Sequence, residues 1–148
     1  MGSVPDARLV GYWTDKNLYL GGMEASDIAF RADGTGWVYW YNAAGGFEVL
    51  RFSWQAAGQD LTVSLHEVVS GTWSLDGGAV THRANSQVGS DEQIALAYEI
   101  TAGRDAIGKP ATLLEFDKPV ILGVTANRFA LERELALDEQ DPARSPCE

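Results

Sequence analysis

Short turn sequences recur through most of the chain, and their close spacing restricts the fold more than any other feature. Seven can be located, at Asp33-Gly34, Gly45-Gly46, Ala57-Gly58-Gln59-Asp60, Asp76-Gly77-Gly78, Gly89-Ser90-Asp91, Gly103-Arg104-Asp105 and Asp117-Lys118-Pro119. The runs between them alternate apolar and polar residues, which is the pattern of strands with one buried face. The sequence therefore predicts an all-β fold, in which one antiparallel sheet of eight to ten strands closes into a barrel.

The chain has 148 residues, a length that suits a single domain. We expect residues 1–10 to form an N-terminal lead-in, residues 11–136 the barrel, and residues 137–148 a polar, mobile tail. Residues 4–10 and the helix-forming residues before Pro142 also predict short helices at the two ends.

Charge and composition exclude several classes of function. The formal net charge of −10 argues against binding to a nucleic acid backbone or to an anionic membrane surface. No window approaches about 18 consecutive apolar residues, and the N-terminus lacks the apolar run of a secretory signal. Cys147 is the single cysteine, so no internal disulfide can form. Together these features predict a cytoplasmic protein.

Metal and cofactor sites are not indicated. The two histidines, His66 and His82, are expected on the surface, and no converging set of three or four ligand residues predicts a metal. The sequence contains no phosphate-binding loop, dinucleotide fingerprint or nucleophile elbow. We therefore predict no metal and no cofactor.

Four of the five residues from Trp37 to Tyr41 are aromatic, and their strand can be placed in register. Two-residue turns at Asp33-Gly34 and Ala44-Gly45 would set Trp37 opposite Phe30. Side chains alternate between faces, so Trp40 would then point outward. On this register the apolar face inside the barrel carries ten large residues: Phe30, Trp37, Tyr39, Leu50, Phe52, Trp54, Leu65, Tyr98, Phe116 and Phe129.

These ten residues are candidates for binding a hydrophobic or aromatic small molecule. Inward-facing tyrosines need hydrogen-bond partners, which favours a cavity with a few polar contacts over a dry core. The alternative is an interior that side chains fill completely, as in many small barrels.

Three polar residues meet at one end of the same predicted face. The register brings Tyr41, Glu48 and Glu67 together, and two facing carboxyls raise the pKa of one of them. Such a pair can serve as general acid and base, so these residues are candidate catalytic groups. The alternative is that they line an open barrel mouth and are simply hydrated.

A resemblance to a known family rests on two short motifs. Gly11-Tyr12-Trp13 at the predicted first strand, and Phe30-x-x-Asp33-Gly34-Thr35-Gly36, resemble the small bacterial lipocalin-like (calycin) barrels. The resemblance implies that Trp13 plugs the closed end of the barrel and that Arg128 or Arg133 lies across its ring. It also implies a hydrophobic small molecule held inside the barrel.

Three hypotheses for function follow. The first is binding of a hydrophobic or aromatic small molecule in the barrel. The second is a cofactor-independent isomerase or cyclase that acts on a hydrophobic metabolite in the same cavity. The third is a protein-interaction module with an outward apolar patch of Val38, Trp40 and Val49, in a monomer or a homodimer.

Overall fold

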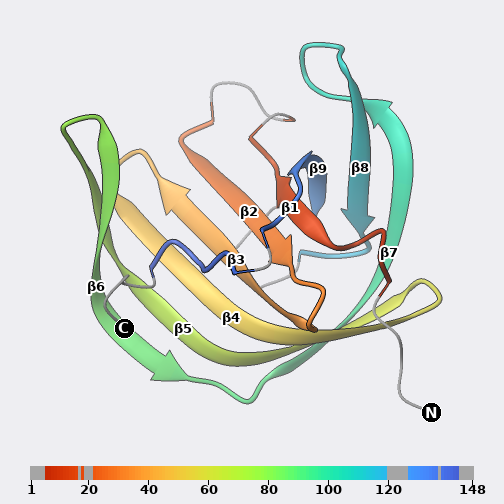
Figure 1. The fold of residues 1–148 in the computed structure, drawn as a ribbon, viewed down its shortest axis with the longest axis horizontal. Helices are drawn as coiled ribbons and strands as arrows, with labels where there is room; N and C mark the ends of the chain where they lie inside the picture. The colour runs from red at the N-terminus through yellow and green to blue at the C-terminus, as the bar shows by residue number, and fades with distance from the viewer. Residues whose placement is uncertain (1–5, 17, 19–21, 120–126, 137, 144–148) are drawn as a thin grey trace.

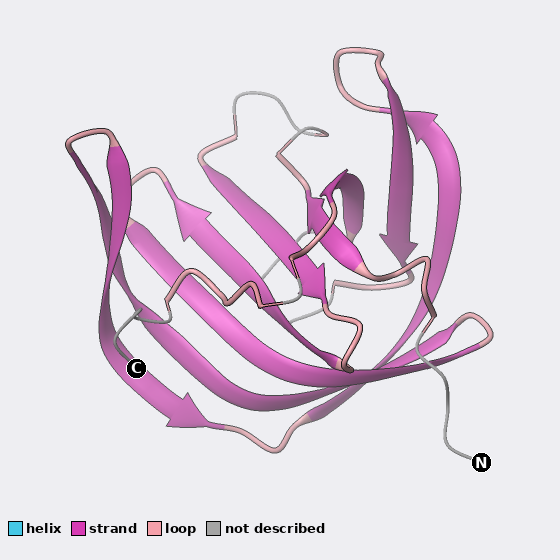
Figure 2. Ribbon diagram, in the orientation of Figure 1, coloured by secondary structure: helices cyan, strands magenta, loops and turns pink. Residues whose placement is uncertain are grey.

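The computed structural model describes residues 6–16, 18, 22–119, 127–136 and 138–143. Within these ranges nine strands form: β1 (Gly11–Thr14), β2 (Glu24–Phe30), β3 (Thr35–Asn42), β4 (Gly46–Ala57), β5 (Asp60–Asp76), β6 (Ala79–Gly89), β7 (Gln93–Arg104), β8 (Pro110–Phe116) and β9 (Arg128–Arg133). All seven predicted turns fall at connections between strands, and the all-β prediction is confirmed. The predicted terminal helices are wrong, because the described residues contain no helix (Figure 2).

The nine strands form one antiparallel sheet in the order β4-β3-β2-β1-β9-β8-β7-β5-β6. An additional pairing of β4 with β5 closes the sheet into a ring. Along β5, residues 60–64 pair with β7, and residues 67–76 pair with β6. The β5–β6 and β7–β8 hairpins consequently rise on opposite sides of the molecule (Figure 1).

Two glycines in the left-handed region set the register of β3. Gly34 (φ 88°) ends a three-residue loop, and its N–H donates to the Arg31 carbonyl oxygen at 3.1 Å. The Asp33 carboxylate fixes this loop by accepting bonds from the N–H and the hydroxyl of Thr35 at 2.9 and 2.6 Å. Gly45 (φ 97°) ends an equivalent loop between β3 and β4. This is the type I turn with a following left-handed glycine that three-residue hairpin loops favour.

The predicted two-residue turns are therefore each wrong by one residue. Phe30 pairs with Gly36 rather than with Trp37. Since a one-residue shift reverses every side chain of a strand, Trp37, Tyr39 and Tyr41 point to the face opposite the predicted one. The two errors cancel at β4, whose predicted inward residues do point inward.

The interior of the ring is filled by seventeen buried residues that come from eight of the nine described strands and from Leu9. Trp13 is fully buried among them, and its Nε1 donates to the Leu9 carbonyl oxygen at 2.9 Å. Val38 belongs to this cluster, and Trp40 packs against it. The predicted outward patch is thus wrong, because these two residues point inward and Val49 is fully buried on the other face.

The outer face of the ring carries a second buried cluster: Tyr12, Ala29, Trp37, Tyr39, Phe47, Val49 and Val69. The chain after β9 crosses this face (Figure 1), and Leu135 and Ala143 pack against the cluster. Arg51 donates to the Asp141 carboxylate at 2.8 and 3.1 Å. Part of the predicted mobile tail is therefore docked, while residues 137 and 144–148 lie outside the described residues.

Gly36 lies where β3 passes between two phenyl rings. A Cβ at this position would stand 2.2 Å from the Ala29 carbonyl oxygen and 2.8 Å from the Phe52 ring. The missing side chain lets Phe30 and Phe52 meet across β3, with ring centroids 5.7 Å apart.

We expect Gly36→Ala to lower the free energy of unfolding by about 1–3 kcal/mol, because the added methyl overpacks this site. The control is Gly89→Ala in β6, where the nearest atom to a Cβ would be 3.9 Å away. Its expected effect is within about 0.5 kcal/mol. Urea denaturation measures both variants, and equal stabilities would contradict the described register.

Candidate functional site

Eight of the ten predicted ligand-binding residues lie in the interior cluster: Phe30, Leu50, Phe52, Trp54, Leu65, Tyr98, Phe116 and Phe129. Each is 0–4% exposed. Their rings contact one another, as Phe30 and Trp54 do at 5.3 Å between centroids. The Tyr98 hydroxyl donates to Asp6 Oδ2 at 2.6 Å, so a protein group satisfies it. These eight side chains form the packed core of the ring, while Trp37 and Tyr39 lie on the outer face.

The predicted group of Tyr41, Glu48 and Glu67 is not formed. Glu48 pairs with Ser70, whereas Glu67 pairs with Arg51 and accepts a hydrogen bond from it at 2.8 Å. A β-bulge next to Arg51 shifts the register of β5 by one residue and so reverses its faces beyond that point. Glu48 and Glu67 therefore lie on opposite faces of the sheet, and the carboxyl pair of the isomerase hypothesis is absent.

The outer face is hollowed between β2, β3 and the β5–β6 hairpin. This concavity, which we call the aromatic groove, has a volume of about 410 Å³ and is lined by Asp27, Tyr39, Tyr41, Trp73, Leu75, Val80 and His82. Leu75 and Val80 form its rim and remain 63% and 53% exposed. The groove exists because the three-residue turns direct the tyrosines of β3 outward.

His82 joins the hairpin wall to the rest of the groove. Its Nε2 lies 2.7 Å from the Tyr39 hydroxyl, and its ring lies edge-on to Phe47 with centroids 4.9 Å apart. Burial lowers the pKa of His82 and raises the pKa of Tyr39 to about 12, so both groups are neutral at pH 7. The prediction of a surface histidine is wrong for His82, whereas His66 is exposed as predicted.

Asp27 lies at the floor of the aromatic groove and is only 4% exposed. Its Oδ2 accepts a hydrogen bond from the Tyr12 hydroxyl at 2.6 Å. Its Oδ1 has no hydrogen-bond partner among the described residues. Burial raises the pKa of Asp27, and the hydroxyls of Thr14 and Tyr12 act in the opposite direction. A buried carboxyl with an unused acceptor is costly, and such a residue beside a concavity is a candidate functional group.

A second concavity of about 350 Å³ adjoins the groove and is lined by Lys16, Gly22, Met23, Glu24, Ala25, Tyr41, Asn42, Ala43 and Trp73. Tyr41 and Trp73 line both concavities and form the partition between them. Tyr41 stacks on Tyr39 with centroids 4.9 Å apart and ring planes 27° apart. Trp73 is fixed by a bond from its Nε1 to the Asn42 carbonyl oxygen at 2.9 Å.

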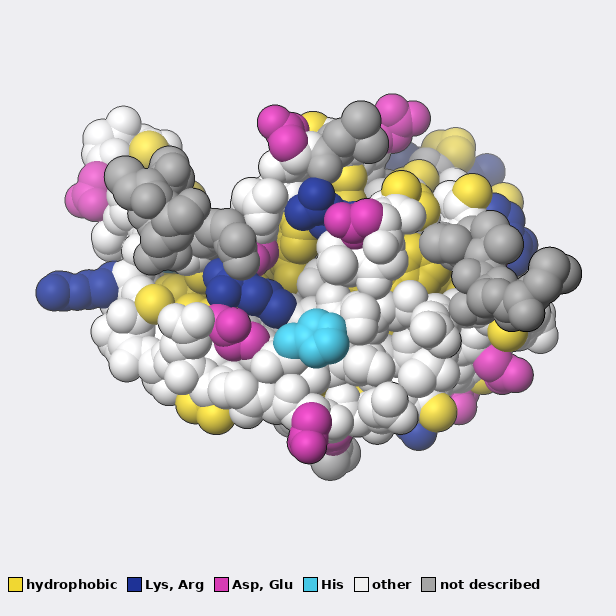
Figure 3. Space-filling model, turned by 60° about the horizontal axis from the view of Figure 1, so that its bottom comes forward, with side chains coloured by type: hydrophobic (Ala, Val, Ile, Leu, Met, Phe, Trp, Pro, Cys, Tyr) yellow, Lys and Arg dark blue, Asp and Glu magenta, His cyan; other side chains and the backbone are white. Residues whose placement is uncertain are grey.

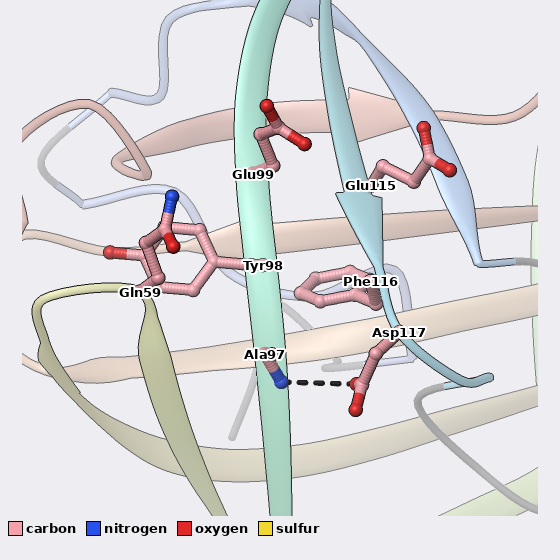
Figure 4. Close-up of a pocket in the computed structure, with 7 residues that line it drawn as sticks. All are labelled: Gln59, Ala97, Tyr98, Glu99, Glu115, Phe116 and Asp117. Carbon is pink, nitrogen blue, oxygen red and sulfur yellow. Dashed lines mark hydrogen bonds between the residues drawn. The ribbon is translucent and has the colours of Figure 1, made fainter.

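A third concavity, of about 250 Å³, lies at β7 and β8 (Figure 4). Glu99 and Glu115 are cross-strand partners and project to the same side of the sheet. Asp117 accepts a bond from the Ala97 N–H at 3.0 Å. Glu99, Glu115 and Asp117 are all exposed, which is the ordinary arrangement of carboxylates on a solvated strand pair.

The late arginine of the calycin resemblance contacts a different ring from the one expected. The guanidinium of Arg133 lies 4.3 Å from the centroid of Tyr12, not over Trp13. Tyr12 and Trp13 alternate along β1, so this cation–π contact is on the outer face of the ring. Arg128, the other candidate, forms an ion pair, with its Nε 3.6 Å from Glu115 Oε2.

The surface mixes charges of both signs. On the face shown in Figure 3, most Lys and Arg side chains lie beside Asp or Glu, and hydrophobic side chains reach the surface between them. Within the described part of the chain, no group of three or more His, Cys, Asp or Glu is placed to hold a metal. Nor do these residues contain a helix that could cross a membrane. Comparison with family models, curated proteins and solved structures finds no significant match to the chain.

Sequence reasoning missed Asp27 and Trp73 as site residues. Asp27 lies on the outer face, where an acid is ordinarily hydrated, so its type and position along the strand do not mark it as buried. The usable signal was the small residue Ala29 on the same face as Asp27, together with its cross-strand partner Tyr12 on the neighbouring strand. Trp73 lies beyond the β-bulge that shifts the register of β5, so its direction does not follow from the alternation before the bulge.

We expect Asp27→Asn to become more stable relative to wild type as pH rises above about 4. The raised pKa means that folded wild type keeps this proton to a higher pH than the unfolded chain, whose carboxyl has a pKa near 3.8. The contribution of Asp27 to the free energy of unfolding of wild type therefore falls as pH rises across this window, and the variant lacks that loss. Urea denaturation at several pH values measures the difference, and a constant difference would contradict the prediction. Burial, and to a smaller extent the charge of Asp27, raise the pKa of Asp15 to about 6, so Asp27→Asn also lowers the pKa of Asp15 and adds to the difference in the same direction.

Proposed function

We propose that this chain is a calycin-like binding protein that holds an aromatic or hydrophobic small molecule in the aromatic groove on the outer face of the ring. The observation that carries the proposal is the composition of the groove. Three aromatic rings and two aliphatic side chains form its walls, and one carboxyl and one imidazole supply polar contacts. Small-molecule sites commonly combine apolar walls with a few placed polar groups in this way.

The rim supports the same proposal. Leu75 and Val80 lie at adjacent paired positions on β5 and β6, and both remain more than half exposed. A ligand lying between them and the stacked rings of Tyr39 and Tyr41 would remove this apolar surface from water. The interior cluster offers no comparable gain, because its side chains are already buried against one another.

We expect Leu75→Ser to weaken binding of the neutral aromatic dye N-phenyl-1-naphthylamine about five-fold, since it removes an apolar contact worth about 1 kcal/mol. Ile107→Ser is the matched control, because Ile107 is 62% exposed, against 63% for Leu75, and lies at the β7–β8 turn. Dye fluorescence titration measures both affinities. Neither change touches the core, so both variants should fold. Equal affinities in the two variants would place the dye outside the groove.

A further inference from the structure

Asp27 is the feature of the groove that a purely apolar ligand leaves unexplained. Asp27 is only 4% exposed, and its buried Oδ1 has no hydrogen bond of normal geometry among the described residues; the Thr14 hydroxyl acts on the carboxyl by lowering its pKa. An unpaired buried acceptor costs stability, and a neutral hydrocarbon in the groove would seal it from water altogether. A ligand that carries positive charge would instead compensate it.

The charges around the partition of the groove are mainly negative. The pKa of Tyr41 is raised by burial and then by Asp27, with Asp15 and Glu132 adding to the rise and Lys16 opposing it. Lys16 is itself engaged, because its Nζ lies 2.8 Å from Glu132. The Lys16–Glu132 pair carries little net charge, which leaves Asp27 and Asp15 as the remaining acidic groups that act on Tyr41.

The lining residues supply no competing cation. The seven side chains of the groove include one carboxyl and no Lys or Arg. His82, the remaining basic group, is held neutral at pH 7 because burial lowers its pKa. Asp27 is therefore the one acidic group among the lining side chains, and no lining cation pairs with it.

The walls favour the same kind of ligand. Tyr39, Tyr41 and Trp73 line one concavity, and π faces attract ammonium groups more strongly where water is excluded. The Tyr39–Tyr41 stack and the Trp73–Asn42 hydrogen bond hold these rings in place before any ligand arrives. Fixed rings that line one concavity together with a buried carboxyl suit an organic cation.

We propose that the aromatic groove is selective for organic ammonium ions, with the Asp27 carboxylate as counter-charge and Tyr39, Tyr41 and Trp73 as cation–π partners. The inference rests on the proposed function, because it names the ligand class of the same groove.

The test compares three probes of similar size on the wild-type protein: 2-phenylethylammonium, 2-phenylethanol and 3-phenylpropionate. All three present a phenyl ring, and they differ mainly in charge. Isothermal titration calorimetry at neutral pH should give an affinity for the ammonium ion at least about ten-fold higher than for the alcohol, with the carboxylate weakest. Equal affinities for all three would overturn the selectivity and leave the proposed function standing. Tightest binding of the carboxylate would also overturn it, whereas no binding by any probe would remove the proposed function as well.

The variant Asp27→Asn tests whether the Asp27 carboxylate is the counter-charge for the bound ammonium ion. We expect the affinity for 2-phenylethylammonium to fall to that for the alcohol, while the affinity for 2-phenylethanol changes less than about two-fold, because the ring contacts are retained. Asp91→Asn removes the same charge from the exposed β6–β7 connection and should leave both affinities unchanged. An ammonium affinity that survives Asp27→Asn would overturn the role of Asp27. Should this variant not fold, the three-probe comparison on wild type still decides the selectivity.

Discussion

The two three-residue turns that end in left-handed Gly34 and Gly45 decide what each face of the sheet can do. One residue fewer in each turn would point Trp37, Tyr39 and Tyr41 into the ring and push Val38 and Trp40 out. With the observed turns, Val38 and Trp40 face the interior, and Gly36 lets Phe30 and Phe52 meet across the strand. The other three rings, Trp37, Tyr39 and Tyr41, lie on the outer face, where the two tyrosines line the aromatic groove. The groove is therefore a consequence of turn length as much as of aromatic content.

Much of the fold was predictable because turn residues and period-two alternation are local signals. The seven turns, the strands between them and the inward residues of β2, β4, β7, β8 and β9 follow from these signals. These signals did not predict which side chains of β3 point into the ring, because Asp33-Gly34 suits either a two-residue turn or the end of a three-residue turn. Glu67 was misplaced for a related reason, since nothing in the local pattern marks the bulge beside Arg51. The terminal helices failed because Leu135, Asp141 and Ala143 gain tertiary contacts on the outer face, which outweigh helix propensity.

The candidate site was less predictable than the fold, because it depends on contacts between distant strands. The approach of His82 to Tyr39 joins β6 to β3. In the described residues two buried side-chain atoms lack hydrogen-bond partners, Asp27 Oδ1 and Trp37 Nε1, and both belong to the outer face. The interior, by contrast, is a tightly packed apolar core whose Trp13 and Tyr98 polar atoms are satisfied. Unsatisfied polar atoms are thus confined to one side of the sheet. This division separates the part that holds the fold together from the part available for recognition.

Closure of the ring pairs the first strand with the last, because β1 lies between β2 and β9. The hydrogen bond from Arg51 to Asp141 likewise cannot form until Asp141, ninety positions further along the chain, has been synthesised. During synthesis the segment from β2 to β5 can form its hairpins early, but the edge of β1 and the outer apolar cluster remain uncovered until β9, Leu135 and Ala143 have left the ribosome. The fold is therefore complete only once β9 and Asp141 are available, and until then the nascent chain exposes a strand edge and an apolar face to chaperones and to other chains.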